Sequence, residues 1–235
     1  MCDRLCFFSR SRDAAPGAGA GESIDVKNKY VELSQIKDWR KQLSHFDFAP
    51  FTFEGGTYNT IEHAFQSKKI SLVDLEKAKL FTVESGDKIG LGDGALAQKN
   101  RKIVKLQAAD LARWADIQVA FLEAVALAKW RQHKKNNSRH HILLLTHNAE
   151  LWHIQRGKPM IRFEHLEKAR EVLLEEEKLE KELEKEKLEV LEQLEQLEQH
   201  AAYDSWLEDQ TERRLRIEAG VEIVDNPYTY EFDYY

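Results

Sequence analysis

The chain has 235 residues, of which 42% are hydrophobic, and its formal net charge is −6 at pH 7. This length suits one domain with appendages or two small domains, and the hydrophobic content is enough for a packed core. The two cysteines, Cys2 and Cys6, exclude a disulfide framework and indicate a reducing compartment, and no apolar run reaches the roughly 18 residues that a membrane span needs.

The first third of the chain gives weak signals for secondary structure. Residues 1–24 carry an Ala-Pro-Gly-Ala-Gly-Ala-Gly run with almost no periodicity, so we predict that they are disordered. We predict a short strand at Tyr30–Leu33. A second strand is predicted at Phe46–Phe53, where aromatic residues alternate with small or polar ones, and it ends at a Glu54-Gly55-Gly56 turn.

Hydrophobic periodicity predicts helices at Asn59–Ile70, Leu72–Ser85 and Ala108–Gln132. The tryptophans of the third helix are predicted to be core anchors. Arg139–Leu145 is either a short helix or a buried strand. Phe163–Leu174 begins a helix that continues into the acidic segment behind it.

Four glycines lie close together at positions 86, 90, 92 and 94. Glycine-rich turns can cradle a phosphate, because backbone N–H groups approach an anion closely there. The spacing here matches neither of the common phosphate-binding patterns, so a plain loop is the favoured interpretation.

The C-terminal part differs in composition from the rest. From Glu171 to Glu198 there are 12 Glu and 4 Lys, which leaves the remainder of the chain slightly basic and compatible with an anionic ligand. We predict a charged helix at 175–215, either solvated and single or forming a short coiled coil, because its leucines do not hold a strict heptad register. An acidic aromatic tail, 216–235, either docks on the domain or meets a partner protein.

The helix at Asn59–Ile70 holds the most informative residues. Glu62, Gln66 and Lys69 fall at i, i+4 and i+7 and therefore share one face, while the opposite side carries apolar residues that can pack. A carboxylate, an amide and an amine on one face are poor core residues, so this face is either the solvated side of an amphipathic helix or a functional face.

This segment, T-Y-N-T-I-E-H-A-F-Q-S-K-K-I, resembles the signature helix of the NADAR family (the YbiA-like domain), with the pattern T-V-E-H-A-F-Q-A-x-K. Leu43-Ser44-His45-Phe46 resembles the family's L-S-N-F, and Ile142–Trp152 resembles its L-L-x-T-G-x-A-x-L segment. The resemblance covers Asn28 to about Leu174 and implies a YbiA-like domain at 25–174. The fold class is therefore expected to be α+β, mainly helical with a small β-sheet, followed by the long charged helix.

The resemblance implies an N-glycosidase, which hydrolyses a ribosyl C–N bond. Such a reaction builds positive charge at the anomeric carbon and needs an acid to protonate the departing nitrogen. Glu62 is the expected acid/base or oxocarbenium-stabilising residue. Lys69 is expected either to form a Schiff base with the opened ribose or to bind a phosphate, and the sequence leaves both roles open.

Further substrate-binding residues follow from the same resemblance. Around the signature helix they are Ser44, His45, Phe46, Tyr58, His63 and Gln66, where His45 replaces the family's Asn. In the later segment Trp152 is expected to stack on a base, Arg156 to clamp a pyrophosphate and Glu150 to be a second carboxylate. The alternative for that segment is a surface turn with a buried Trp. No metal-ligand spacing is present, so we predict neither a metal nor a cofactor.

Three functions compete. The first is removal of ADP-ribose from guanine in nucleic acid or nucleotides, with the basic stretches 99–105 and 129–139 available for phosphates. The second is hydrolysis of ribosylated amino-pyrimidine intermediates of riboflavin biosynthesis. The third is a non-catalytic nucleotide-binding scaffold. In each case we expect a cytoplasmic or nuclear protein with no membrane partner.

Overall fold

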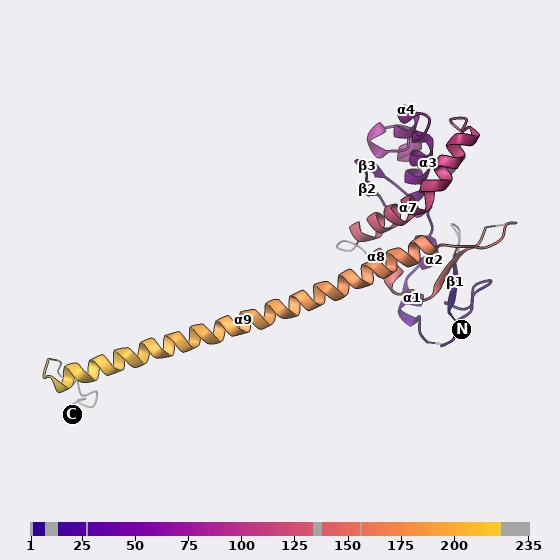
Figure 1. Cartoon of the computed structure of the whole chain (residues 1–235). Coiled ribbons are helices and arrows are strands. Elements are labelled where there is room, and N and C mark those ends of the chain that lie inside the picture. Colours follow the sequence, from indigo (N-terminus) through magenta and orange to yellow (C-terminus); the bar gives the residue numbers. More distant parts are fainter. Residues whose placement is uncertain (1, 8–13, 27, 134–137, 156, 222–235) are drawn as a thin grey trace, which may run out of the picture. The chain divides into compact units, whose positions relative to one another are not determined.

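The computed structural model describes the chain except for residues 1, 8–13, 27, 134–137, 156 and 222–235 (Figure 1). The chain forms two compact units, which we call unit 1 (Met1–Glu177) and unit 2 (Lys178–Tyr235). Helices predominate among the described residues, with two small sheets in unit 1 and a long C-terminal helix. The expected α+β class is thereby confirmed.

A three-stranded sheet brings the two ends of unit 1 together. Strand β1 (Arg4–Phe7) pairs in parallel with β4 (Glu150–His153), and β5 (Ile161–Arg162) pairs antiparallel with β4. The predicted disorder of residues 1–24 is therefore wrong for β1. Leu5 and Phe7 are fully buried, so this short strand is stabilised by burial against distant residues rather than by its own propensity.

The stretch at 14–21, which contains the Ala-Pro-Gly run, is also held in place by hydrogen bonds. Arg40 and Glu22 form a buried ion pair, with 2.8 Å between Nη2 and Oε2. The same Glu22 oxygen accepts hydrogen bonds from the backbone N–H groups of Gly17 and Gly19. Hydrogen bonds to Glu22, which is itself paired with Arg40, therefore order a stretch whose composition predicts disorder.

The second sheet is a hairpin of β2 (Phe51–Phe53) and β3 (Gly56–Tyr58). Its turn places Glu54 and Gly55 at positive φ, 47° and 82°, as a two-residue hairpin loop requires. The strand predicted at Phe46–Phe53 is present only in its last three residues. The strand predicted at Tyr30–Leu33 is wrong, because that region forms helix α1 with Leu33 buried.

Helices make up most of the other regular structure among the described residues. Their bounds are α1 (Val31–Gln35), α2 (Trp39–Gln42), α3 (Ile61–Ser71), α4 (Leu75–Lys79), η1 (Val83–Ser85), α5 (Lys88–Leu91), α6 (Gly94–Lys99), α7 (Ala108–Gln132), α8 (Ser138–Leu144) and α9 (Glu164–Glu218). The prediction for α7 is confirmed to the residue. The helix predicted at Leu72–Ser85 is divided into α4 and η1, and the segment left open at Arg139–Leu145 is helical.

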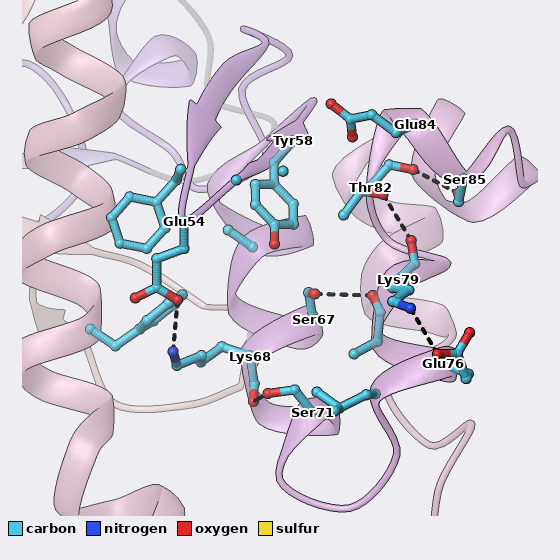
Figure 2. A pocket seen from close by; sticks show the side chains of 17 residues that line it. Glu54, Tyr58, Ser67, Lys68, Ser71, Glu76, Lys79, Thr82, Glu84 and Ser85 are labelled. Atoms are coloured by element: carbon cyan, nitrogen blue, oxygen red, sulfur yellow. Dashed lines mark hydrogen bonds and ion pairs between the residues drawn. The ribbon is translucent and has the colours of Figure 1, made fainter.

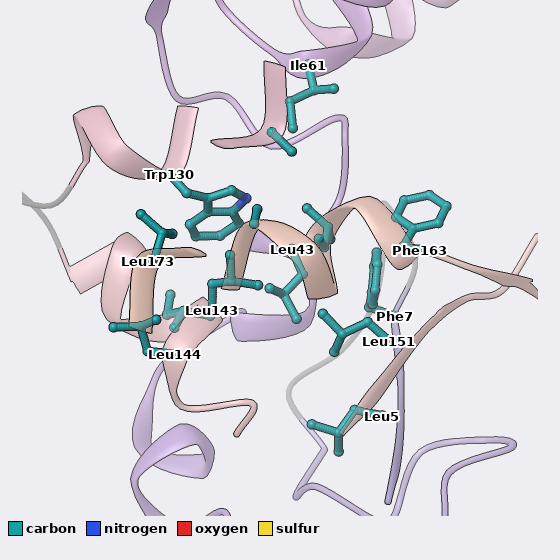
Figure 3. Close-up of a cluster of buried hydrophobic side chains, with 14 of the residues drawn as sticks. Leu5, Phe7, Leu43, Ile61, Trp130, Leu143, Leu144, Leu151, Phe163 and Leu173 are labelled. Atoms are coloured by element: carbon teal, nitrogen blue, oxygen red, sulfur yellow. The ribbon is translucent and has the colours of Figure 1, made fainter. Parts of the chain in front are cut away.

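The main core of unit 1 joins residues from both of its ends (Figure 3). Leu5 and Phe7 of β1 lie in it with Trp130 of α7 and with Leu166 and Leu173 of α9. Trp114 is buried as well, so both tryptophans of α7 are core anchors as predicted. A smaller cluster of Ile70, Ala78, Phe81, Ile89 and Ala97 packs α3 against α4, α5 and α6.

In unit 2, the described chain is the part of α9 that begins at Lys178 and a short turn after Glu218. Nearly all its described side chains are exposed. The predicted helix at 175–215 is confirmed, whereas residues 222–235 of the predicted aromatic tail lie outside the described residues. Within the described part of the chain, no helix combines the length and the apolar character that crossing a membrane demands.

Candidate active site

The start of α3 is fixed by capping and by the loops on either side. Thr60 is the N-cap, and its side chain accepts a hydrogen bond from the backbone N–H of His63. The backbone N–H of Glu62 donates to the carbonyl of His45 at 3.1 Å. The first turn of the signature helix is therefore held against the L-S-H-F segment that precedes the hairpin.

Glu62 and Gln66 form a buried pair on one face of α3. They are 7% and 4% exposed, and Gln66 Nε2 donates to Glu62 Oε1 at 2.7 Å. Gln66 Oε1 is buried and has no hydrogen-bond partner among the described residues. Since a buried acceptor without a donor costs free energy, this oxygen is suited to accept an N–H or O–H group from a ligand.

Burial raises the pKa of the Glu62 carboxyl to about 7, from an ordinary value of 4.5. The Gln66 hydrogen bond and the positive charges of Arg101 and Lys69 act in the opposite direction but do not offset the burial. A carboxyl with such a pKa is present in both protonation states at neutral pH, which suits a general acid/base.

Lys69 lies at the edge of this buried pair. It is half-buried, two turns beyond Glu62 on the same face, and it lowers the pKa of the Glu62 carboxyl by its charge. Within the described residues, Lys69 Nζ makes no hydrogen bond or ion pair. Arg101, just after α6, acts on Glu62 in the same direction and more strongly. We call Glu62, Gln66, Lys69 and Arg101 the Glu62 face.

The opposite side of α3 lines a pocket with a cavity volume of about 630 Å³ (Figure 2). Ala64, Ser67, Lys68 and Ser71 of α3 face it, and Tyr58 enters it from β3. On a helix these α3 residues lie roughly opposite Glu62 and Gln66. Tyr58, predicted to bind the substrate, is therefore not brought together with Glu62.

The charged groups of this pocket are already engaged within the protein. Lys68 Nζ pairs with Glu54 at 2.7 Å, and Lys79 Nζ pairs with Glu76 at 2.7 Å. Glu84 accepts hydrogen bonds from the backbone N–H of Thr57. The pocket thus offers a ligand few uncompensated charges.

The stretch that contains the four glycines at 86–94 packs against the start of α3. Asn59 Nδ2 donates to the carbonyls of Gly90 and Gly92, at 3.0 and 3.3 Å. A Cβ at Gly90 would lie 2.0 Å from the carbonyl oxygen of Thr82, so only glycine fits there. These contacts give the glycines a packing role, but the plain-loop interpretation is wrong in part, because Gly90 lies in α5 and Gly94 begins α6.

His63 has a structural position in this arrangement. It is fully buried, with Nδ1 2.8 Å from Thr60 Oγ1 and Nε2 2.9 Å from the carbonyl of Ile89. Burial lowers the pKa of its imidazole. Since both ring nitrogens have partners, His63 connects α3 to α5 instead of presenting a nitrogen to a substrate.

The L-S-H-F segment contributes mainly through its backbone. Ser44 is buried, and its Oγ accepts from the N–H of Phe46. Phe46 is half-buried against Gly94, where an added Cβ would lie 2.9 Å from the Phe46 Cα and ring. The segment thus contacts both the start of α6, at Gly94, and the first turn of α3.

The side chain of His45 points to a different cluster. Its Nε2 lies 2.7 Å from Nε2 of His165, its ring stacks on Phe163, and His153 packs on the same phenylalanine. Burial lowers the pKa of all three imidazoles, to about 4 for His165 and well below the ordinary value for His45. The three rings are therefore neutral at pH 7.

Glu150 and Trp152 lie in β4 and bind each other there. Trp152 Nε1 donates to Glu150 Oε2 at 2.9 Å, Arg162 pairs with Glu150 at 3.1 Å, and Arg4 lies over the Trp152 ring. Figure 1 shows β1, the neighbour of β4, well separated from α3 within unit 1. The structure does not bring these two residues to Glu62, and Arg156 lies outside the described residues.

Among the predicted residues, the structure thus brings together Glu62, Gln66 and Lys69, with the backbone of His45. From the sequence, Arg101 is only one of several residues in the basic stretch 99–105. No local signal connects it to Glu62, because the contact depends on α6 packing against α3. Within the described residues, no group of three or more His, Cys, Asp or Glu side chains is arranged to hold a metal ion.

Comparison with family models, with curated proteins and with solved structures found no match to this chain. Membership of the NADAR family therefore remains a hypothesis that rests on the three motifs.

Proposed function

We propose that the chain is an N-glycosidase that hydrolyses the ribosyl C–N bond of ADP-ribosylated guanine, with Glu62 as its acid/base residue. The observation that carries the proposal is the buried Glu62 carboxyl, whose pKa burial raises to about 7, beside two cationic side chains. The motif resemblance supplies the reaction class, and the Glu62 face supplies groups that such a reaction needs.

In this reaction the bond between the anomeric carbon and the guanine amino nitrogen breaks. A protonated Glu62 donates its proton to the leaving nitrogen, and the resulting carboxylate stabilises positive charge at the anomeric carbon. Water then adds its oxygen to that carbon and returns a proton to Glu62. The products are ADP-ribose and unmodified guanine, and Glu62 ends in its starting state.

Lys69 has two roles compatible with its position. In the first, the ribose ring opens by breaking the bond between the anomeric carbon and the ring oxygen, which takes up a proton, and the resulting imine exchanges the guanine amine for the neutral amine of Lys69. Water hydrolyses this Schiff base and releases ADP-ribose. In the second, the ammonium of Lys69 binds a phosphate of the ADP-ribose. Arg101 offers a second cation for the pyrophosphate, because a guanidinium can bind two phosphate oxygens at once.

The experiment compares three substrates with the purified full chain: ADP-ribosyl-guanine in DNA, the corresponding free nucleotide, and a ribosylated amino-pyrimidine phosphate. Products are separated by chromatography, and Glu62→Gln is run beside the wild type. Release of ADP-ribose by the wild type and not by the variant supports the proposal. Cleavage of the pyrimidine alone would replace it with the riboflavin-pathway function, and no cleavage of any substrate would favour the scaffold.

Borohydride reduction separates the two roles of Lys69. If the Schiff base forms, reduction during turnover links the ribose to Lys69, and mass spectrometry finds the adduct on the peptide that contains it. Absence of the adduct during active turnover contradicts the covalent role and favours phosphate binding.

A further inference from the structure

One stripe of the unit 2 helix carries apolar side chains that are open to solvent. Leu183, Val190 and Leu197 are spaced seven residues apart. Leu194 lies four residues after Val190, and Ala201 lies four residues after Leu197. In a helix these positions form one seam, as the d and a positions of a heptad repeat do. The four larger side chains are 51% to 66% exposed. We call these five residues the seam.

Two charged residues share the same heptad positions. Lys187 occupies the a position between Leu183 and Val190, and Asp204 is the d position that follows Leu197. In a parallel pair of helices, each a position faces the same a position of the second copy, and each d position faces the same d position. Lys187 would then face Lys187, and Asp204 would face Asp204, which is repulsive in both cases.

An antiparallel pair sets a positions against d positions and relieves this repulsion. When Leu194 faces Leu197 of the second copy, the spacing of the sequence makes Val190 face Ala201 and Lys187 face Asp204. Two-fold symmetry produces each of these layers twice. At the outer end of the paired segment the same register sets Leu183 against Glu208, so the apolar and charge match covers the layers from Lys187 to Asp204.

Neighbouring registers are less favourable. Sliding one copy by a heptad sets Asp204 against Leu194 in one direction and against Glu180 in the other. The first direction places two carboxylates in apolar layers of the seam, because Glu208 then also faces Val190. The second places two carboxylates together and sets Lys187 against Leu197. A polar residue at a core position commonly fixes register in this way.

We propose that the chain associates with a second copy of itself through this seam, as an antiparallel two-stranded coiled coil in the register that pairs Lys187 with Asp204. The inference is independent of the glycosidase function, since it rests on unit 2 alone. It identifies the partner of the exposed leucines as the same helix in another molecule.

The test is sedimentation equilibrium of the full chain, comparing wild type with Lys187→Glu, Asp204→Lys and the double variant. Each single change turns both Lys–Asp pairs of the dimer into like-charge pairs. We expect each to raise the dissociation constant about tenfold or more, and the double variant to restore it because the pairs are re-formed with exchanged signs.

Lys181→Glu and Asp209→Lys are matched controls, because they change the charge identically at exposed positions that lie outside the a and d positions of the heptad repeat. We expect both to associate as the wild type does, and circular dichroism to show unchanged helix content in all variants. A wild type that stays monomeric at its highest soluble concentration would overturn the proposal. Single seam variants that associate like the wild type, or a double variant no tighter than the single ones, would also overturn it.

Discussion

Each face of α3 carries a lysine, and the two faces differ in whether a described residue forms an ion pair with that lysine. On one face, Lys68 lies in a pocket and is paired with Glu54 at 2.7 Å. On the other, Lys69 has no such partner among the described residues, and Glu62 is buried with a pKa raised to about 7. A cavity alone therefore does not locate chemistry, because reactive groups are those whose charges the fold leaves uncompensated.

The largest effect is expected from Glu62→Gln, which keeps the shape of the side chain and removes its proton chemistry. We predict a loss of glycosidase activity of about a hundredfold to ten-thousandfold, measured as ADP-ribose release from modified DNA. Activity close to the wild-type level would remove Glu62 from the acid/base role.

The same variant has a predictable effect on stability. Because the folded-state pKa of Glu62 is raised from 4.5 to about 7, its protonated form stabilises the fold at low pH, and this contribution is lost as pH rises through 7. The full difference corresponds to about 3 kcal/mol. The wild type should thus lose stability relative to Glu62→Gln between pH 4.5 and 7 in urea unfolding, and a constant difference would contradict the raised pKa.

A comparison of Lys69→Ala with Lys68→Ala sharpens the contrast between the faces. We expect Lys69→Ala to lower activity about a hundredfold, since it removes a cation beside the reacting bond. Lys68→Ala should change activity by no more than about threefold, because it removes a partly exposed ion pair on the pocket side. Equal losses of activity in the two variants would contradict the proposed difference between Lys69 and Lys68.

Gly90→Ala tests the packing of α5, where the carbonyl of Gly90 accepts a hydrogen bond from Asn59 at the start of α3. The added Cβ would meet the Thr82 carbonyl oxygen at 2.0 Å, so the backbone must move, and we expect a loss of about 1–3 kcal/mol in the free energy of unfolding. Gly55→Ala is not a neutral control, because its φ is positive, but Ser71→Ala on the pocket face is suitable. An unchanged unfolding midpoint for Gly90→Ala would show that α5 can move away from the Thr82 carbonyl without loss of stability, which contradicts this prediction.

The smallest effect concerns the His45–His165 pair. Because burial lowers the pKa of the His45 imidazole well below its ordinary value of 6.5, the contribution of this side chain to stability is complete above pH 6.5 and is lost as pH falls below that value. We predict that His45→Asn, which installs the residue of the resembled family, flattens this dependence below pH 6.5. Thermal unfolding at pH 7, 6, 5 and 4 measures it, and parallel curves for wild type and variant would contradict it.

Local sequence signals predicted those elements whose stability is local. The period of α7 and the Thr60 cap are encoded within a few turns, so both are predictable. Strand β1 was missed because its burial depends on β4, more than 140 residues later. Helical spacing placed Glu62, Gln66 and Lys69 on one face of α3, but the burial of Glu62 was not expected, because it depends on tertiary packing against α3.

The site residues divide in the same manner. Helical spacing alone places Glu62, Gln66 and Lys69 on one face. Spacing cannot show that His63 has both nitrogens engaged inside the protein, or that Arg101 acts on Glu62, because those contacts come from α5 and from the residues after α6. Tertiary packing therefore decides which residues of a matching motif remain available for chemistry.

The most direct measurement is the titration of Glu62 itself. Carbon-13 labelling of the glutamate carboxyls, with the Glu62 resonance assigned as the one lost in Glu62→Gln, gives its pKa by NMR. The account predicts a midpoint of about 7, set by burial beside Gln66. A midpoint near the ordinary 4.5 would show a solvated carboxylate and contradict the claim that this face holds an acid/base residue.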